Sequence, residues 1–165
     1  MPATAAIASP DKFTLEAPRV ALATRDGEHL VVAQTTIDPG EWLLTIEGEL
    51  VSAPCRYSVQ VGPDEHIAPP AALIRPDGND AYLWRFLNHS CNPNAIIVRR
   101  VLIAIRAIAA GEEITFDYNT NEYAMASPFN CRCGHCGGVE IRGFHYLTPA
   151  EKKMRQHRLA DHLRE

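Results

Sequence analysis

The sequence lacks any long uninterrupted apolar stretch. Its most apolar segment, residues 96–108, is broken by Arg99, Arg100 and Arg106, whereas a membrane-spanning helix needs about 20 consecutive apolar residues. The N-terminal stretch also has no basic residues leading into an apolar run, so we expect no secretory signal. These absences predict a soluble, intracellular protein with no membrane partner, nuclear if its host has a nucleus.

An excess of positive charge is absent as well. The chain has 16 Lys and Arg against 20 Asp and Glu, a formal net charge of −4. Proteins that bind nucleic acids usually show a basic patch or stripe, so direct nucleic-acid binding is not expected. A mildly acidic chain suits a basic substrate electrostatically, but an ordinary acidic surface explains the same charge equally well.

The cysteines do not form an even set. There are five, and three of them, Cys131, Cys133 and Cys136, fall within six residues. An odd number with no secretory signal argues against a disulfide framework, and tight Cys spacing is typical of metal sites.

The chain is rich in residues that favour turns. Twelve prolines and ten glycines are spread over 165 residues, which favours one domain of short strands and turns with few helices. Residues 1–12 are predicted to be a loose N-terminal arm, 68–78 a loop and 82–87 one or two helical turns. Strands are predicted at 20–24, 30–33, 42–46, 57–61, 95–98, 101–105 and 113–118.

The end of the chain carries the strongest helix signal. Thr148 is followed by Pro149 and by Glu151, which together form a capping box with proline in the first turn. We therefore predict a helix within residues 146–165, with Met154, Leu159 and Leu163 on its apolar face.

Three segments stand out in chemistry. They are Arg85–Asn94 (RFLNHSCNPN), Gly111–Tyr118 (GEEITFDY) and Cys131–Gly138 (CRCGHCGG). Each alone has an ordinary explanation as a loop, a core strand or a structural metal staple. Together and in this order, the segments resemble the SET-domain family of protein lysine methyltransferases, as does the earlier stretch Ile37–Glu49 with its IxxGE and GE.

The resemblance covers residues 31–138 and implies a fold class. That fold is mainly β with short helices, the SET-domain β-clip, in which the C-terminal segment passes through a loop as a pseudoknot. Such threading is rare in proteins, and here it would bring Asn88 and His89 beside Tyr118. The expected division is a SET domain at 13–127, a zinc-binding post-SET segment at 128–145 and the C-terminal helix at 146–165.

The resemblance also implies an activity, the transfer of a methyl group from S-adenosylmethionine to a lysine amine. By resemblance, Tyr118 is the catalytic residue and also contacts the cofactor, together with Asn88 and His89. A phenol with a pKa near 10 is a poor base at neutral pH, so we assign Tyr118 to orienting the amine. Arg85 and Phe86 are expected to brace the cofactor loop, with Phe86 in the core.

Three aromatic residues are candidates for a channel that holds the substrate lysine: Tyr57, Tyr82 and Phe116. Ordinary packing explains the two tyrosines equally well. The number of methyl groups transferred would depend on how such aromatics surround the amine.

The cysteines imply structural zinc held by four thiolates, Cys91, Cys131, Cys133 and Cys136. The family's tail is usually Cys-x-Cys-x4-Cys, and here it is Cys-x-Cys-x2-Cys. His135 or His145 is an alternative to Cys91 as the fourth ligand. Cys55 is left over and is expected to be a buried, inert thiol.

One departure from the family pattern concerns the glycines expected beside the cofactor. The family carries Gly-x-Gly where Glu28 and Leu30 stand in this chain. Gly27 is a candidate replacement through a shifted turn, and the loss of both glycines puts cofactor binding in question.

Three functions are therefore open from the sequence. The first is methylation of an exposed lysine on a protein partner, such as a histone or another basic protein. The second is methylation of a small amine or free amino acid, and the third is a non-catalytic SET-like module that binds a partner. The oligomeric state, monomer or homodimer, is open.

Overall fold

The computed structural model describes residues 18–164. The N-terminal arm predicted at residues 1–12 lies outside the described residues. No helix among the described residues is both long and apolar enough to cross a membrane.

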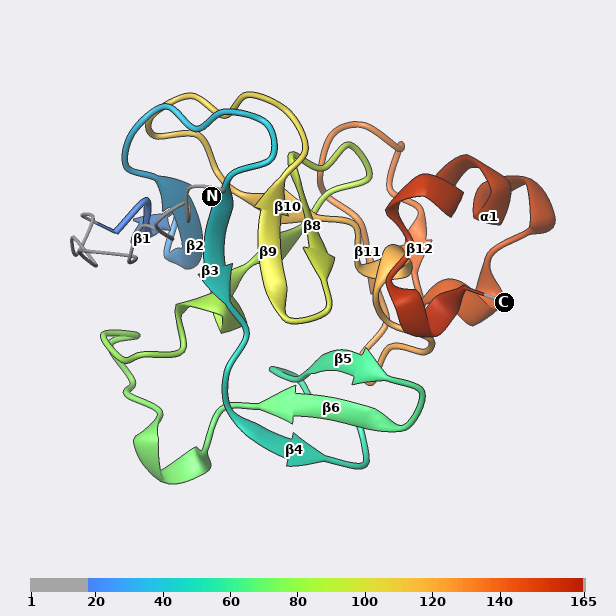
Figure 1. The fold of residues 1–165 in the computed structure, drawn as a ribbon, viewed down its shortest axis with the longest axis horizontal. Coiled ribbons are helices and arrows are strands. Elements are labelled where there is room, and N and C mark those ends of the chain that lie inside the picture. The colour runs from blue at the N-terminus through green and yellow to red at the C-terminus, as the bar shows by residue number, and fades with distance from the viewer. Residues whose placement is uncertain (1–17, 165) are drawn as a thin grey trace, which may run out of the picture.

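The chain forms a set of small β-sheets with short helices (Figure 1). The strands are β1 (Val20–Arg25), β2 (Glu28–Ala33), β3 (Trp42–Thr45), β4 (Glu49–Val51), β5 (Val59–Gly62), β6 (Glu65–Ala68), β7 (Asn88–His89), β8 (Ala95–Val98), β9 (Val101–Ala104), β10 (Thr115–Phe116), β11 (Phe129–Asn130) and β12 (Glu140–Ile141). The helix is α1 (Pro149–Arg155), and 3-10 turns lie at Ala71–Leu73, Leu83–Phe86, Tyr118–Thr120, Phe144–Tyr146, Gln156–Arg158 and Asp161–Leu163.

The described strands form five small sheets. Three are two-stranded (β1-β2, β10-β7 and β11-β12) and two are three-stranded (β3-β9-β8 and β4-β6-β5). Asp26 and Gly27 have positive φ angles of 52° and 81° in the β1–β2 turn, as a tight Asp-Gly hairpin requires. The predicted mainly β architecture with a C-terminal helix is confirmed.

The core lies where these sheets face one another. In the β3-β9-β8 sheet, Leu43, Leu102 and Ile97 point inward and are at most 8% exposed. The opposite face carries Trp42 and Val98, which are 73% and 37% exposed. This alternation follows from the two-residue period of side chains along a strand.

The fold joins the first two sequence motifs directly. Strand β7 pairs in parallel with β10, with Asn88 opposite Thr115 and His89 opposite Phe116. The buried Asn94 side chain accepts a hydrogen bond from the Thr115 backbone at 2.9 Å and donates one to the Glu113 carbonyl at 2.8 Å. The turn-rich motif around residue 90 is therefore a structural partner of the strand that leads to Tyr118.

The C-terminal helix is shorter than predicted. The capping box is present, because the Glu151 amide donates to the Thr148 hydroxyl and Glu151 bonds the Thr148 backbone in return. The α-helix nevertheless ends at Arg155, and Leu159 and Ala160 are extended, with ψ angles of 137° and 151°. The Ala160 amide donates to the Thr120 carbonyl at 2.8 Å instead of to a helical carbonyl.

The predicted apolar face of that helix does not form, because Leu159 and Leu163 lie beyond its last residue, Arg155. Met154 is 64% exposed, whereas Leu159 and Leu163 are buried. Burial of these two leucines and of Ala160 outweighs the continuation of one short helix, because isolated helices of this length are marginal without tertiary packing.

Gly143 marks the point where the end of the chain meets the segment after Tyr118. Its φ is 106°, and a Cβ added there would lie 2.7 Å from the Tyr123 carbonyl oxygen. We expect Gly143→Ala to lower the free energy of unfolding by more than about 2 kcal/mol, because backbone strain and overlap add together. Urea unfolding measures this loss.

Gly40→Ala is the matched control. Gly40 has a φ of 89° with open space around its added Cβ, so it reports strain alone, about 1–2 kcal/mol. Equal losses at the two glycines would contradict the close approach at Gly143.

Candidate active site and metal centre

Tyr118 follows β10 and is held at both ends. Its hydroxyl donates to the Leu87 carbonyl at 2.6 Å, and its backbone amide donates to His89 Nδ1 at 3.1 Å. Burial, followed by the negative charges of Glu122 and Glu113, raises the pKa of the Tyr118 phenol. The phenol therefore stays protonated, its hydrogen faces Leu87, and the oxygen lone pairs are left to accept a hydrogen bond from a bound group.

His89 connects Tyr118 to the cysteines. Because the Tyr118 amide is a donor, Nδ1 of His89 must be the acceptor, and the proton of the neutral ring then sits on Nε2. That nitrogen lies 3.3 Å from Cys91 Sγ. Burial lowers the pKa of His89, against the raising effect of Asp117, which agrees with a neutral ring.

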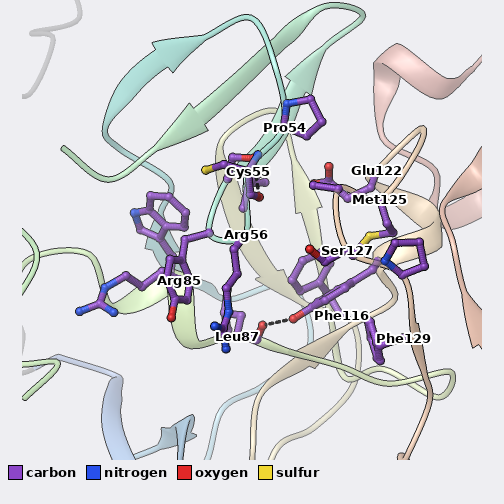
Figure 2. A pocket seen from close by; sticks show the side chains of 17 residues that line it. Pro54, Cys55, Arg56, Arg85, Leu87, Phe116, Glu122, Met125, Ser127 and Phe129 are labelled. Carbon is purple, nitrogen blue, oxygen red and sulfur yellow. Dashed lines mark hydrogen bonds between the residues drawn. The ribbon is translucent and has the colours of Figure 1, made fainter. Parts of the chain in front are cut away.

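Two hollows meet at Tyr118. We call the first the apolar hollow; it has a volume of about 520 Å³ and is shown in Figure 2. It is lined by Pro54, Cys55, Arg56, Tyr57, Ser58, Val59, Trp84, Arg85, Leu87, Phe116, Tyr118, Glu122, Met125, Ala126, Ser127, Pro128 and Phe129.

The second, the polar hollow, has a volume of about 740 Å³. It is lined by Glu28, Asn88, His89, Ser90, Asn92, Asn94, Arg106, Glu112, Glu113, Thr115, Tyr118, Phe129, Asn130, Arg132, Cys133 and His135. Both volumes lie in the range of small-molecule sites. Tyr118 and Phe129 line both hollows, so a group bound in one can reach a group bound in the other beside these rings.

In the polar hollow, Asn88 is held in place by an acidic partner. Its Nδ2 donates to Glu113 Oε1 at 2.8 Å, which leaves the amide oxygen of Asn88 to accept from a ligand. Glu28 lies on the same hollow, while Leu30 is buried at 4% exposure. Of the two positions where the family carries glycine, one thus holds Glu28, which lines the polar hollow, and the other holds the buried Leu30.

The remaining predicted site residues divide between the apolar hollow and the packing around it. Tyr57 and Phe116 line the apolar hollow, whereas Tyr82 packs against the core. Arg85 also lines the apolar hollow, not the polar one, and donates to Asp80 at 2.7 Å. The Phe86 ring lies under the Arg85 guanidinium at 3.9 Å, so this pair supports the loop that leads into β7.

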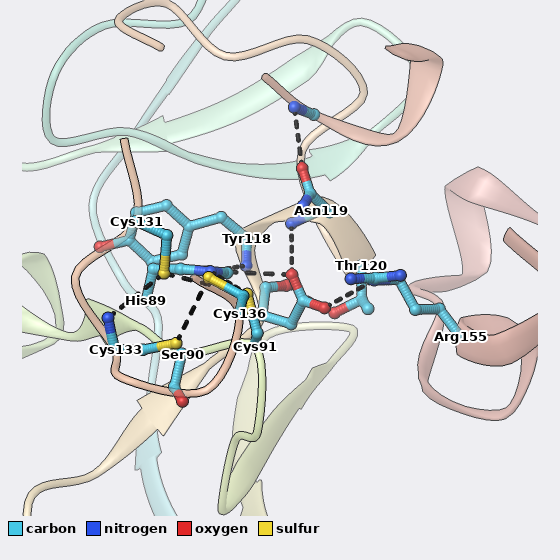
Figure 3. Close-up of polar contacts among 12 residues, drawn as sticks. His89, Ser90, Cys91, Tyr118, Asn119, Thr120, Cys131, Cys133, Cys136 and Arg155 are labelled. Carbon is cyan, nitrogen blue, oxygen red and sulfur yellow. Dashed lines mark hydrogen bonds and ion pairs between the residues drawn. The ribbon is translucent and has the colours of Figure 1, made fainter. Parts of the chain in front are cut away.

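The four predicted cysteines converge into one cluster (Figure 3). Their sulfur atoms all lie within 4.8 Å of one another, with Cys91 3.8 Å from Cys131 and Cys133 3.9 Å from Cys136. Four sulfurs around zinc at about 2.3 Å would be about 3.8 Å apart in tetrahedral geometry. The donor set and its spacing therefore fit structural zinc.

Backbone donors add to this fit. The Cys133 and His135 amides donate to the sulfurs of Cys131 and Cys133, each at 3.4 Å. Burial and hydrogen bonds with neighbouring thiols raise the pKa of the Cys91 thiol, so a cation is needed for all four to be thiolates together. Cys91, not His135 or His145, completes the cluster.

Cys55 is exposed, and the prediction of a buried thiol is wrong. It lies in the loop between β4 and β5, where its backbone amide and carbonyl both bond the Ser58 hydroxyl, at 2.8 and 3.1 Å. This local turn holds the backbone and leaves the side chain at the edge of the apolar hollow.

Two site residues were missed from the sequence. Phe129 packs edge-on against Tyr118, with ring centroids 5.8 Å apart, and its position just before Cys131 was the only available signal. Glu122 is buried on the apolar hollow, where its Oε1 accepts from the Gln60 amide at 2.8 Å and from Asn121 Nδ2 at 3.1 Å.

Glu122 makes stability depend on pH. Burial raises its pKa to about 7 from an ordinary 4.5, against the lowering effect of the hydrogen bonds from Gln60 and Asn121. Between about pH 4.5 and 7 the folded state keeps the Glu122 proton that the unfolded state has released. The contribution of protonated Glu122 to the free energy of unfolding is therefore complete below about pH 4.5 and is lost as the pH rises through about 7. At about 1.4 kcal/mol per pKa unit, the loss is on the order of 3 kcal/mol.

Glu122→Gln should remove this component. Urea unfolding at about pH 5 and about pH 8 should show a smaller drop in the variant than in the parent chain. Glu65→Gln, which removes an exposed carboxylate from β6, is the control and should keep the parent's drop. An unchanged drop in Glu122→Gln would contradict the assignment.

Comparison with known proteins gives a family match. A model of the SET domain matches residues 28–119 of this chain. The match contains Asn88, His89 and Tyr118 and ends before the cysteine-rich tail.

Several curated proteins are similar over part of the chain, and each of the following is named "Histone-lysine N-methyltransferase, H3 lysine-36 specific". The Candida albicans protein is 44% identical over 77 residues, 41% of this chain and 9% of that protein. The Aspergillus fumigatus protein is 35% identical over 123 residues, 64% and 13% of the two. The Candida glabrata protein is 48% identical over 82 residues, 45% and 11%. The chain thus spans about a tenth of the length of these relatives.

Proposed function

Because the chain belongs to the SET-domain family, we propose that it transfers a methyl group from S-adenosylmethionine to a lysine amine of a protein substrate. The observation that carries this proposal is the meeting of the two hollows at Tyr118 and Phe129. A methyl donor in the polar hollow and an amine in the apolar hollow would face each other there. The names of the similar proteins support the same activity.

The polar hollow suits the cofactor. S-adenosylmethionine carries an ammonium, a carboxylate and ribose hydroxyls, and the hollow offers Asn88, Glu28 and Arg106 to meet groups of each kind. When bound, the cofactor supplies a sulfonium-activated methyl group. Asn88, fixed by Glu113, is proposed to accept a hydrogen bond from its amino-acid end.

The residues of this chain orient the amine and keep it neutral. A free lysine with a pKa near 10.4 is almost fully protonated at neutral pH, and an apolar lining of Val59, Leu87 and Phe116 disfavours the charged form by desolvation. The Tyr118 oxygen would accept a hydrogen bond from an N–H of the neutral amine. This bond would align the lone pair of the amine nitrogen with the methyl carbon. With the cofactor bound, the N–C bond would form as the C–S bond breaks, and the proton that the lysine ammonium gives up before the attack would go to water.

The cysteine cluster would hold structural zinc. With four thiolates there is no open position for a substrate, so the ion would fix residues 131–136 and with them Phe129. The division into a SET domain at 13–127, a zinc segment at 128–145 and a C-terminal element at 146–165 is part of this proposal.

Two edge strands that line the apolar hollow favour a protein substrate over a small amine. Strand β5 ends its sheet and contributes Val59 to the apolar hollow, and β11 of a two-stranded sheet contributes Phe129. An extended peptide can add to such edges through backbone hydrogen bonds while one side chain enters the hollow.

The test is methyl transfer with labelled S-adenosylmethionine. Intact histone H3, a mixed set of lysine peptides, and free lysine are offered separately to the zinc-loaded protein, and products are located by mass spectrometry. We expect methyl-lysine in histone H3 or in peptides. Transfer to free lysine alone would support the small-amine function, and a chain that neither binds the cofactor nor transfers a methyl group would support a non-catalytic binding module.

A further inference from the structure

The segment just after Tyr118 is enclosed by the end of the chain. Residues 119–123 bond residues 143–162 almost one by one, although no pattern in the sequence joins the two stretches. The Gly143 amide donates to Asn119 Oδ1 at 2.9 Å, and the Ala160 amide donates to the Thr120 carbonyl at 2.8 Å. The Phe144 amide donates to the Glu122 carbonyl at 2.8 Å, and the His145 amide donates to the Tyr123 carbonyl at 2.9 Å. His162 Nε2 lies 2.7 Å from the Asn121 carbonyl.

One charged contact extends this enclosure to the residue next to Tyr118. Arg155, the last residue of α1, donates from Nε to Asp117 Oδ2 at 2.8 Å. The Asp117 side chain is fully buried and that of Arg155 is 12% exposed. A buried carboxylate needs such a partner, because removal of one member leaves an uncompensated charge.

Asp117 also accepts hydrogen bonds from the two residues that follow Tyr118. Its Oδ1 accepts the Asn119 amide at 3.0 Å, and its carbonyl accepts the Thr120 hydroxyl at 2.7 Å. Tyr118 sits inside this turn, with its own amide on His89. The position of the phenol therefore depends on a carboxylate that Arg155 holds.

We propose that Arg155 is a positioning residue for Tyr118, acting through Asp117, so that the C-terminal segment 143–163 completes the active site. This inference rests on the proposed methyltransferase function. The SET-domain match ends at residue 119, so it contains Asp117 and Tyr118, whereas Arg155 lies in a part of the chain that the family model does not cover. Arg155 touches neither hollow and is not a catalytic residue.

The experiment compares Arg155→Met, Arg155→Lys and Lys153→Met in the full, zinc-loaded chain. Lys153 lies in the same helix and is exposed. For each variant, kcat and the KM values for S-adenosylmethionine and a lysine peptide are measured below its unfolding temperature. Hydrogen exchange of the Tyr118 amide is measured alongside.

We expect Arg155→Met to lower kcat at least tenfold and to speed exchange at Tyr118, with the KM for S-adenosylmethionine within about twofold of the parent value. Arg155→Lys should recover part of kcat, because it keeps the charge but loses the Nε–H geometry. Lys153→Met should match the parent. If Arg155→Met does not fold, a lowered kcat in Arg155→Lys with an unchanged KM supports the positioning role, and a parental kcat in Arg155→Lys overturns it.

A purely structural role would give a lower unfolding temperature with unchanged kcat and unchanged exchange at Tyr118, and would overturn the proposal. Failure of the proposed function looks different, since the parent chain itself would transfer no methyl group. In that case exchange at Tyr118 decides: faster exchange in Arg155→Met than in Lys153→Met supports the positioning role, and equal exchange overturns it.

Discussion

Replacement of Tyr118 by phenylalanine is expected to lower kcat by about 100- to 1,000-fold, the usual cost of removing one preorganised hydrogen-bonding group from a reacting centre. The hydroxyl is fixed on the Leu87 carbonyl at 2.6 Å, so its lone pairs are left to accept a hydrogen bond from the amine. Phenylalanine keeps the ring and its packing on Phe116 and Phe129. Steady-state kinetics with a lysine peptide measures the loss.

The same variant should bind S-adenosylmethionine with nearly unchanged affinity, because the polar hollow keeps Asn88 and its partner Glu113. Tyr146→Phe is the control, since Tyr146 is 49% exposed and lines neither hollow. A Tyr118→Phe protein with parental kcat would show that the hydroxyl does not orient the amine.

Removal of the zinc ion proposed for the cysteine cluster is expected to have the largest effect on folding. Structural zinc contributes on the order of 10–16 kcal/mol in small peptides, which is as large as the whole stability of a typical domain. The cluster joins Cys91, next to β7, to the loop between β11 and β12. Its loss should therefore release Phe129 from Tyr118 and abolish methyl transfer.

A strong chelator or Cys131→Ser should produce this state, followed by thermal unfolding, metal analysis and the activity assay. Cys55→Ser should keep both zinc content and unfolding temperature, because Cys55 lies outside the cluster. A chelated protein that keeps its unfolding temperature and its activity would contradict a structural metal.

Local signals in the sequence predicted the local structure well. The strands predicted at 20–24 and 30–33 and the capping box at Thr148 all form, because each depends mainly on neighbouring residues. The end of the helix was not predictable in this way. Leu159 and Ala160 are buried beyond the end of the helix, and the Ala160 amide bonds the Thr120 carbonyl in the segment after Tyr118, so tertiary contacts decide where the helix ends.

The site was predictable only where a motif marked it. The order of the three motifs led to the four cysteines and to Tyr118, and the structure brings these residues close together. Arg155 lies 38 residues from Asp117, and one basic residue among three in a short helix carries no signal of a buried partner. Cys55 is exposed because its backbone, and not its side chain, forms the turn with Ser58.

The assignment of the two hollows is tested by a calorimetric titration of S-adenosylmethionine into the zinc-loaded protein and three variants. Asn88→Ala removes a group from the polar hollow, Tyr57→Ala one from the apolar hollow, and Tyr118→Phe the hydroxyl between them. We predict clear binding that weakens at least tenfold in Asn88→Ala and is nearly unchanged in the other two. Absence of binding at millimolar cofactor, or binding that Tyr57→Ala abolishes and Asn88→Ala leaves intact, would contradict this assignment.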